Sequence, residues 1–160
     1  MAVLPCEEAR SHLRKRLPSG VRYTAPEKWH ITLAFLGDVP ADRFGEVTRA
    51  LDEVPPPADL TLHLAEGGNF RDAVWAGVAG DVPALATFRT GIHTALSEAG
   101  FPLDERPFTP HLTVSYRFSR PLLRSLQGYT GPSWPVTSFT LLHSEAGVHV
   151  PIAGYGPVTA

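Results

Sequence analysis

Cysteine is nearly absent from this 160-residue chain, in which Cys6 is the only one. A single thiol forms no intrachain disulfide and cannot build a cysteine-rich zinc site. Long hydrophobic runs are missing too, and the N-terminal residues lack the basic-then-apolar order of a signal peptide. On these grounds we expect a soluble, cytoplasmic protein without a membrane span.

Net charge is also small, at −2 with neutral histidines, and the isoelectric point is about 6.4. Broad binding along a nucleic-acid backbone needs a basic surface, so the charge balance argues against it. A small anionic ligand or an RNA end needs only a few local cations and stays compatible. The length and the 43% hydrophobic content predict one globular domain over residues 1–160.

Hydrophobic spacing predicts helices and strands in mixed order. The expected helices cover residues 7–17, 42–54, 83–99 and 121–127, the second with Asp42 as its cap and Phe44, Val47 and Leu51 facing inward. The expected strands cover residues 29–36, 59–65, 73–79, 112–118 and 136–143, with an edge strand at 149–152 and a turn at 67–69. This order indicates an α+β fold with several antiparallel pairs.

Two short motifs carry the chemistry, because only two of the seven histidines have a threonine two residues later. These are His30-Ile31-Thr32 and His111-Leu112-Thr113, in opposite halves of the chain. Residues two apart in a strand point to the same side, so each histidine shares a face with its threonine. The repetition suggests two similar lobes about a pseudo-twofold axis.

A pair of imidazoles suits acid–base chemistry on a phosphate. Histidine gives or takes a proton near neutrality, and two of them can divide the roles of acid and base. Threonine hydroxyls can donate hydrogen bonds to the phosphate oxygens. The competing interpretation is ordinary strand sequence, since threonine favours strands and a lone histidine is more often structural. The repetition of the whole pattern favours the functional interpretation.

The two motifs resemble the signatures of the 2H phosphoesterases. The resemblance rests on residues 30–37, His-Ile-Thr-Leu-Ala-Phe-Leu-Gly, and 108–114, Phe-Thr-Pro-His-Leu-Thr-Val, and it covers nearly the whole chain. The most similar branch is that of the RNA 2′,3′-cyclic phosphodiesterases, often labelled 2′–5′ RNA ligases. It implies a bilobal α+β fold, with antiparallel-rich sheets around a central cleft and helices on the outer faces.

The resemblance also implies a reaction, the opening of a 2′,3′-cyclic phosphate at an RNA end or on a nucleotide to leave a 2′-phosphomonoester. His30 would protonate the departing 3′ oxygen and His111 would activate water, while Thr32 and Thr113 would hold the phosphate oxygens. The sequence by itself gives no asymmetry between the two histidines. No metal or other cofactor is implied, and we expect a monomer.

The chain departs from the family pattern in two places. Only Ala2 to Leu4 precede Pro5 where relatives begin with a full strand, so we expect a shortened first strand. An arginine often follows the second motif at the position of Tyr116, and here the arginine is its neighbour Arg117. Either Tyr116 takes over the substrate contact, or a bulge presents Arg117.

Further substrate contacts and functions remain open. Trp29 and Phe108 flank the motifs and either stack on a nucleobase or pack beside the cleft, and Arg106 is a candidate phosphate contact. The reverse reaction would join a 2′,3′-cyclic end to a 5′-hydroxyl, and a binding module would hold phosphorylated RNA ends without turnover. A metal-dependent hydrolase would instead use a loop site at His143, Glu145 and His149.

Overall fold

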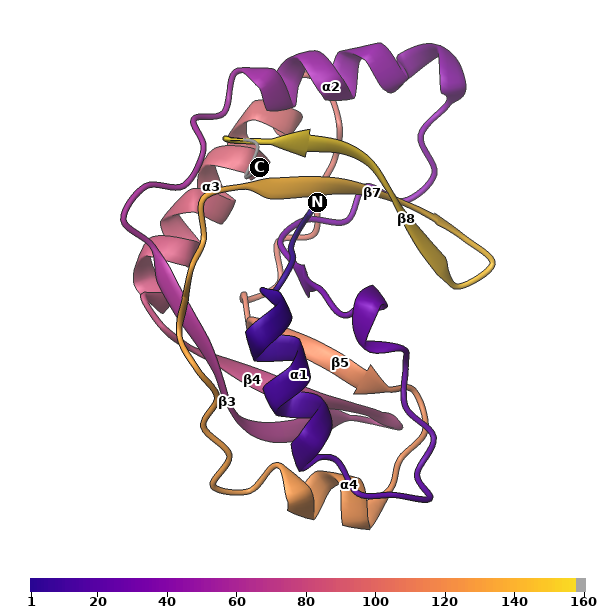
Figure 1. The fold of residues 1–160 in the computed structure, drawn as a ribbon. Helices are drawn as coiled ribbons and strands as arrows, with labels where there is room; N and C mark the ends of the chain where they lie inside the picture. Colours follow the sequence, from indigo (N-terminus) through magenta and orange to yellow (C-terminus); the bar gives the residue numbers. More distant parts are fainter. Residues whose placement is uncertain (158–160) are drawn as a thin grey trace.

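One antiparallel sheet runs through the computed structural model, which describes residues 1–157 (Figure 1). Over these residues its eight strands follow the order β6-β3-β4-β5-β2-β1-β7-β8, and each neighbouring pair is antiparallel. The strands are β1 (Ala2–Val3), β2 (Ile31–Thr32), β3 (Thr61–Phe70), β4 (Ala73–Gly80), β5 (His111–Ser115), β6 (Trp134–Pro135), β7 (Phe139–Glu145) and β8 (Val148–Tyr155). The helices are α1 (Glu7–Arg16), α2 (Phe44–Asp52), α3 (Val82–Glu98) and α4 (Arg120–Ser125), with 3-10 turns η1 (Pro26–Lys28) and η2 (Ala41–Arg43).

The elements fall into two halves that meet where β2 pairs with β5. In Figure 1, α1 and α4 accompany β3, β4 and β5 in the lower half, and α2 and α3 accompany β7 and β8 in the upper half. Contacts of α1 with β3 and of α4 with β3 and β4 agree with this division, as do those between α2 and α3. The predicted α+β class with two lobes is therefore confirmed.

Helix α3 forms where apolar residues recur at helical spacing. Leu85, Ile92 and Leu96 lie on one face and are fully buried. Gly100 follows the helix with a φ of +87°, a conformation that glycine adopts without steric cost. None of the helices within residues 1–157 is both long and apolar enough to cross a membrane.

The first motif strand is shorter than predicted, since β2 covers two residues of the expected 29–36. Its partner β1 is equally short, and Ala2 pairs with Thr32 at the end of the ladder. Beyond it, the backbone N–H groups of Leu33 and Ala34 both donate to the carbonyl of Met1, at 2.8 and 3.3 Å. The chain bends there instead of continuing as a strand.

The turn expected at residues 67–69 is wrong, because β3 continues to Phe70 and the reversal comes at Arg71 and Asp72. The two glycines serve close packing. A Cβ on Gly67 would lie 2.5 Å from the Cβ of Leu126, and one on Gly68 would overlap the indole of Trp75. Glycine in a strand interior can mark such an approach as readily as a turn.

Several smaller expectations also need correction. The helix predicted over 42–54 is divided into η2 and α2, Asp42 caps neither, and Phe44 is 41% exposed. The second motif strand ends at Ser115 instead of 118, because the Ser115 hydroxyl bonds the backbone of Arg117 and draws the chain into a turn. The strand expected at 136–143 lies at 139–145, the edge strand expected at 149–152 extends over 148–155, and the short strand β6 was not expected.

Candidate active site

The two motifs lie on adjacent strands, with Ile31 of β2 directly opposite Leu112 of β5. In an antiparallel pair, the register advances by one residue on each strand in opposite directions. Continuing it by one residue each way sets His30 opposite Thr113 and Thr32 opposite His111. Directly opposite residues have Cβ atoms about 4.5–5.5 Å apart. The four polar side chains therefore form one group, in which each histidine faces the other motif's threonine.

Burial separates this polar group from the core. Ile31 and Leu112 are fully buried, whereas His111 and Thr113 are partly exposed and Thr32 is exposed. The period of two in each strand explains the contrast, because successive side chains point to opposite faces. The predicted sharing of faces within each His-x-Thr motif is confirmed by this pattern.

Both histidines are held in the same way at Nδ1. His30 Nδ1 lies 2.9 Å from the Lys28 carbonyl oxygen, and His111 Nδ1 lies 2.7 Å from that of Thr109. A carbonyl oxygen only accepts, so Nδ1–H is the donor in each case. The exchangeable site of each ring is then Nε2, which carries a proton in the imidazolium and a lone pair in the neutral ring.

Positive charge and burial both act on His30. Burial is the main cause that lowers its pKa below the usual 6.5, and the hydrogen bond to Lys28 opposes that effect. The charges of His149, the amino group of Met1 and His111 lower the pKa further. The contribution of His111 reflects the proximity of the two motif histidines.

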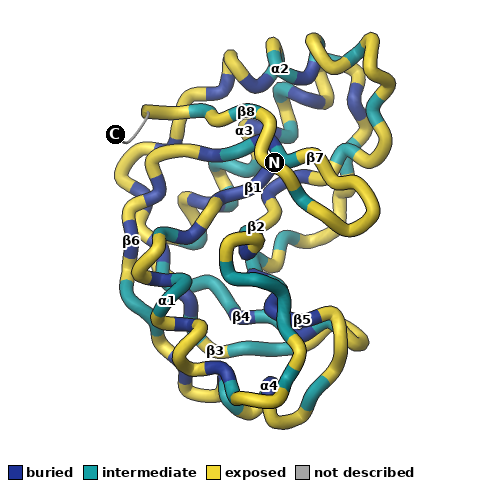
Figure 2. Tube along the Cα trace, turned by 45° about the vertical axis from the view of Figure 1, so that its right-hand side comes forward, coloured by how far each residue is buried: buried dark blue, intermediate teal, exposed yellow. Residues whose placement is uncertain are grey.

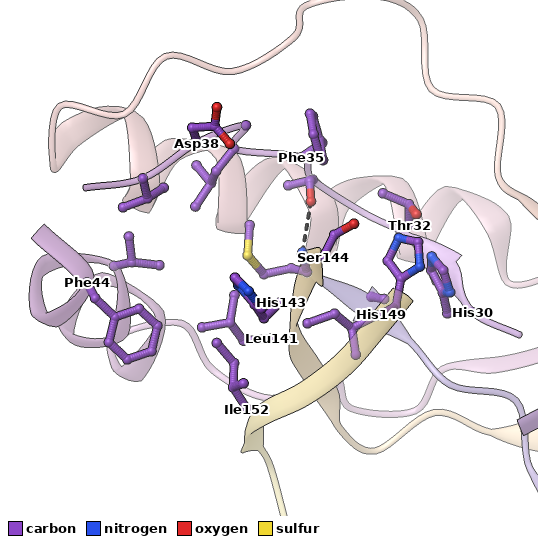
Figure 3. A pocket seen from close by; sticks show the side chains of 18 residues that line it. His30, Thr32, Phe35, Asp38, Phe44, Leu141, His143, Ser144, His149 and Ile152 are labelled. Atoms are coloured by element: carbon purple, nitrogen blue, oxygen red, sulfur yellow. Dashed lines mark hydrogen bonds between the residues drawn. The ribbon is translucent and has the colours of Figure 1, made fainter. Parts of the chain in front are cut away.

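A cavity of about 330 Å³ opens beside the first motif (Figure 3). His30, Thr32 and His149 lie at one end of it in that view, and Phe35, Asp38 and Phe44 lie toward the other end. The amino group of Met1 donates to the Ala34 carbonyl at 2.8 Å within it. Residues of loop 34–39, α2 and the β7–β8 hairpin complete the lining.

In the second motif, His111 lies against aromatic side chains instead. The ring of Phe70 meets the ring of His111 edge-on at a centroid distance of 5.1 Å, and Trp75 lies 5.8 Å from it. Phe70 is 48% exposed, so one part of its ring supports His111 and another faces solvent. An exposed ring beside a phosphate site can stack on a nucleobase.

The two aromatic residues that flank the motifs pack against the core to different degrees. Trp29 is 1% exposed and its Nε1 donates to Thr24 Oγ1 at 3.0 Å, so the indole belongs to the core. Phe108 is half-buried against the core, with the Arg89 guanidinium 4.7 Å from its ring centroid. Of the two roles left open for these residues, packing therefore accounts for Trp29, and Phe108 packs against the core with part of its ring exposed.

The three polar candidates for substrate contact lie on exposed loops. Arg106 is engaged by Asp104, with Nε 2.6 Å from Oδ2, and its side chain is 84% exposed. Tyr116 is 62% exposed and Arg117 is exposed, and both follow the end of β5. The register of β5 against β4 does shift near its end, with Trp75 opposite Thr113 and Val74 opposite Ser115, but Arg117 lies two residues beyond the last residue of the strand.

His149 is the functional candidate that the sequence did not connect with the motifs. Its ring centroid lies 4.7 Å from that of His30, and both rings line the same cavity. The sequence predicted an edge strand that begins at His149, but that local pattern does not show which residue the His149 side chain contacts. His143 instead pairs with Glu145 at 3.6 Å, and no three metal-binding side chains among the described residues are grouped to hold an ion.

The fold and the paired motifs together define a two-histidine, or 2H, phosphoesterase. The chain belongs to the 2′-5′ RNA ligase superfamily, whose sequence model matches residues 5–147.

Named relatives agree with this membership. An RNA 2′,3′-cyclic phosphodiesterase of Geobacillus stearothermophilus is 38% identical over 98 residues, which is 58% of this chain and 31% of that protein. The RNA 2′,3′-cyclic phosphodiesterase of Escherichia coli K12 is 29% identical over 130 residues, or 80% of this chain and 73% of that protein. The chain thus spans less than a third of the first relative.

Solved structures show the same fold. The apo form of E. coli LigT has a TM-score of 0.75 and 25% sequence identity, covering 97% of this chain and 94% of LigT. LigT complexed with 3′-AMP has a TM-score of 0.76 and 24% identity, covering 99% of this chain and 96% of LigT.

Proposed function

We propose that this chain hydrolyses the 2′,3′-cyclic phosphate of an RNA 3′ end or of a nucleotide to a 2′-phosphomonoester. The observation that carries the proposal is the Ile31–Leu112 register, which sets each motif histidine opposite the other motif's threonine. The names of the relatives, RNA 2′,3′-cyclic phosphodiesterases, support the choice of substrate. The reaction as proposed uses protein side chains alone.

The four side chains divide the work of one displacement at phosphorus. His111 Nε2 takes a proton from the attacking water, whose oxygen forms the new bond to phosphorus. The bond between phosphorus and the 3′ oxygen breaks, and His30 Nε2 gives its proton to that oxygen. The hydroxyls of Thr32 and Thr113 donate to the nonbridging oxygens, on which negative charge accumulates in the transition state.

The lowered pKa of His30 fits the role of acid once substrate is bound. A proton on a ring of low pKa is weakly held and passes readily to a leaving alkoxide. A bound phosphate adds the opposite charge close to the ring and favours the imidazolium, which offsets the burial that disfavours it. The assignment of acid to His30 and base to His111 follows the family resemblance.

The reverse reaction is the second candidate, and the family description as RNA ligases favours it. In this reaction the 5′-hydroxyl of a second RNA end takes the place of water: His111 would take its proton, its oxygen would form the new bond to phosphorus, and the 3′ oxygen would leave with the proton of His30. A binder of phosphorylated RNA ends without turnover would use the same contacts.

One assay distinguishes these functions. An oligonucleotide that ends in a 2′,3′-cyclic phosphate is incubated with the protein in EDTA, and the isomer of the product is identified. We expect a 2′-phosphate, with turnover that EDTA leaves intact. A 3′-phosphate would reverse the proposed roles of the histidines, and binding without turnover would overturn the hydrolase.

A further inference from the structure

The β7–β8 hairpin brings a third imidazole to the first motif. Its two-residue turn at Ala146 and Gly147 has φ angles of +49° and +77°, the conformation that joins antiparallel strands tightly. His149 follows in β8 and pairs with Ser144 of β7. Figure 2 shows this hairpin as an exposed segment beside β1, and Figure 3 shows the His149 ring next to that of His30.

The contact is close enough to restrict the His30 ring. The ring centroids lie 4.7 Å apart with an angle of 46° between the planes, within the range of packed aromatic pairs. The hydrogen bond from Nδ1 to Lys28 fixes one edge of His30. A second ring against its face limits the remaining rotation, which would otherwise move Nε2 away from the phosphate.

The two motif histidines are supported in the same way but by different chemistry. Phe70 from the β3–β4 hairpin packs on His111, and His149 from the β7–β8 hairpin packs on His30. Phenylalanine carries no charge at any pH, whereas an imidazole can take up a proton. Only the His30 side of the site therefore has a supporting ring that can become positive.

We propose that His149 is a positioning residue that holds the His30 ring toward the phosphate and, when protonated, adds positive charge beside it. This inference rests on the proposed function and assigns a part in it to a residue outside both motifs. The charged groups that act on His30 come from three elements, His149 of β8, the Met1 amino group beside β1 and His111 of β5. All are cationic when protonated, so each opposes a proton on His30.

Two substitutions separate the two effects of His149. His149→Phe keeps a ring against His30 and removes its charge, so the titration midpoint of His30 should rise and kcat should fall less than in His149→Ala. His149→Ala removes the ring as well, and we expect kcat to fall by about 10- to 100-fold, since small displacements of a reacting group cost this much. KM changes less than kcat, because the phosphate contacts remain.

The measurements are kcat and KM across pH on the cyclic-phosphate oligonucleotide, and the NMR titration of the His30 ring without substrate. Val150→Ala is the matched control, because Val150 is the next residue of β8, is 50% exposed and does not line the cavity. It should leave both readouts unchanged. Thermal unfolding of each variant checks that the hairpin change has not disrupted the fold.

The proposal is overturned if His149→Ala leaves kcat and the His30 titration unchanged, or if both variants lower kcat equally without moving that titration. The NMR titration needs no turnover. A protein that fails to open the cyclic phosphate, but whose His30 midpoint rises in His149→Phe, would refute the proposed function while retaining the coupling of the two rings.

Discussion

Ile31 pairs with Leu112 across β2 and β5, and this buried pair lies directly behind the candidate site. Both side chains are fully buried, so the hydrophobic core fixes the register of the two strands. A slip of β2 by one residue would turn His30 and Thr32 toward the core and expose Ile31, and a slip of β5 would do the same to His111, Thr113 and Leu112. The energy that keeps the four polar groups together therefore comes from packing on the opposite face.

The threonine hydroxyls are expected to act mainly in the transition state. Thr32→Val and Thr113→Val remove a donor at nearly constant volume, and each should lower kcat/KM by about 10²–10³-fold, as the loss of one oxyanion donor does elsewhere. Steady-state kinetics on the cyclic substrate measures the effect. Thr87→Val, on an exposed turn of α3, is the matched control. Equal rates for all the variants would exclude the threonines from catalysis.

Phosphate binding should change the protonation of His30. Burial lowers the pKa of His30 below 6.5 in the free protein, so its NMR titration midpoint should lie below that value. Inorganic phosphate at the site favours the charged ring and should raise the midpoint. If the midpoint stays in place while phosphate shifts other resonances of the motifs, the anion does not lie against His30.

Stability should fall as pH drops below about 6.5. Burial lowers the pKa values of His30 and His93. Just below pH 6.5 the unfolded chain therefore binds more protons at these two rings than the folded chain does. The Met1 amino group, whose pKa burial lowers from 8.0 to about 6, has the same sign, and its contribution begins to be lost at higher pH, below about 8. The carboxylates of Glu46 and Asp104, whose pKa values are lowered by arginine partners, contribute only at more acidic pH.

Urea unfolding at pH 7.5 and 5.5 measures this loss of stability. The loss should be smaller in His93→Gln, whose side chain no longer titrates. A variant that loses as much stability as the unsubstituted protein over this interval would show that His93 does not contribute to it.

Gly68 tests the packing of β3 on β4. A methyl group there would overlap the Trp75 indole, so Gly68→Ala should destabilise the fold by about 1–3 kcal/mol through overpacking. Gly91→Ala is the opposite control, because its Cβ meets nothing within 4 Å and alanine favours the helix interior by about 1 kcal/mol. Thermal denaturation of both variants should give shifts of opposite sign. A neutral Gly68→Ala would contradict the close approach.

The sequence predicted the elements whose patterns are local. The stripe of α3 and the alternation around His30 and His111 are set by residues within one element, and both are found as expected. The fold class followed from the order of the elements and from the family resemblance. The cross-strand pairing of histidine with threonine needs the register of two distant segments, which periodicity alone does not give.

The features that the sequence did not predict are those that depend on contacts between residues distant in the chain. Glycines at 67 and 68 have the composition of a turn, and the neighbours that require them, Leu126 and Trp75, are distant or on the next strand. The choice between the two roles left open for Trp29 likewise depended on where the core lies, and burial places its indole inside. The approach of His149 to His30 depends on how a hairpin at the end of the chain lies over β2, which no local pattern encodes.

The most direct measurement is the single-turnover rate on a 2′,3′-cyclic phosphate oligonucleotide in EDTA for His30→Ala, His111→Ala and the double variant. If the two imidazoles act together on one phosphorus, each single variant should lose about 10²–10⁴-fold, and the double variant should lose much less than the product of the two. A single variant that keeps the full rate, or two losses that simply multiply, would contradict the joint action of the two rings.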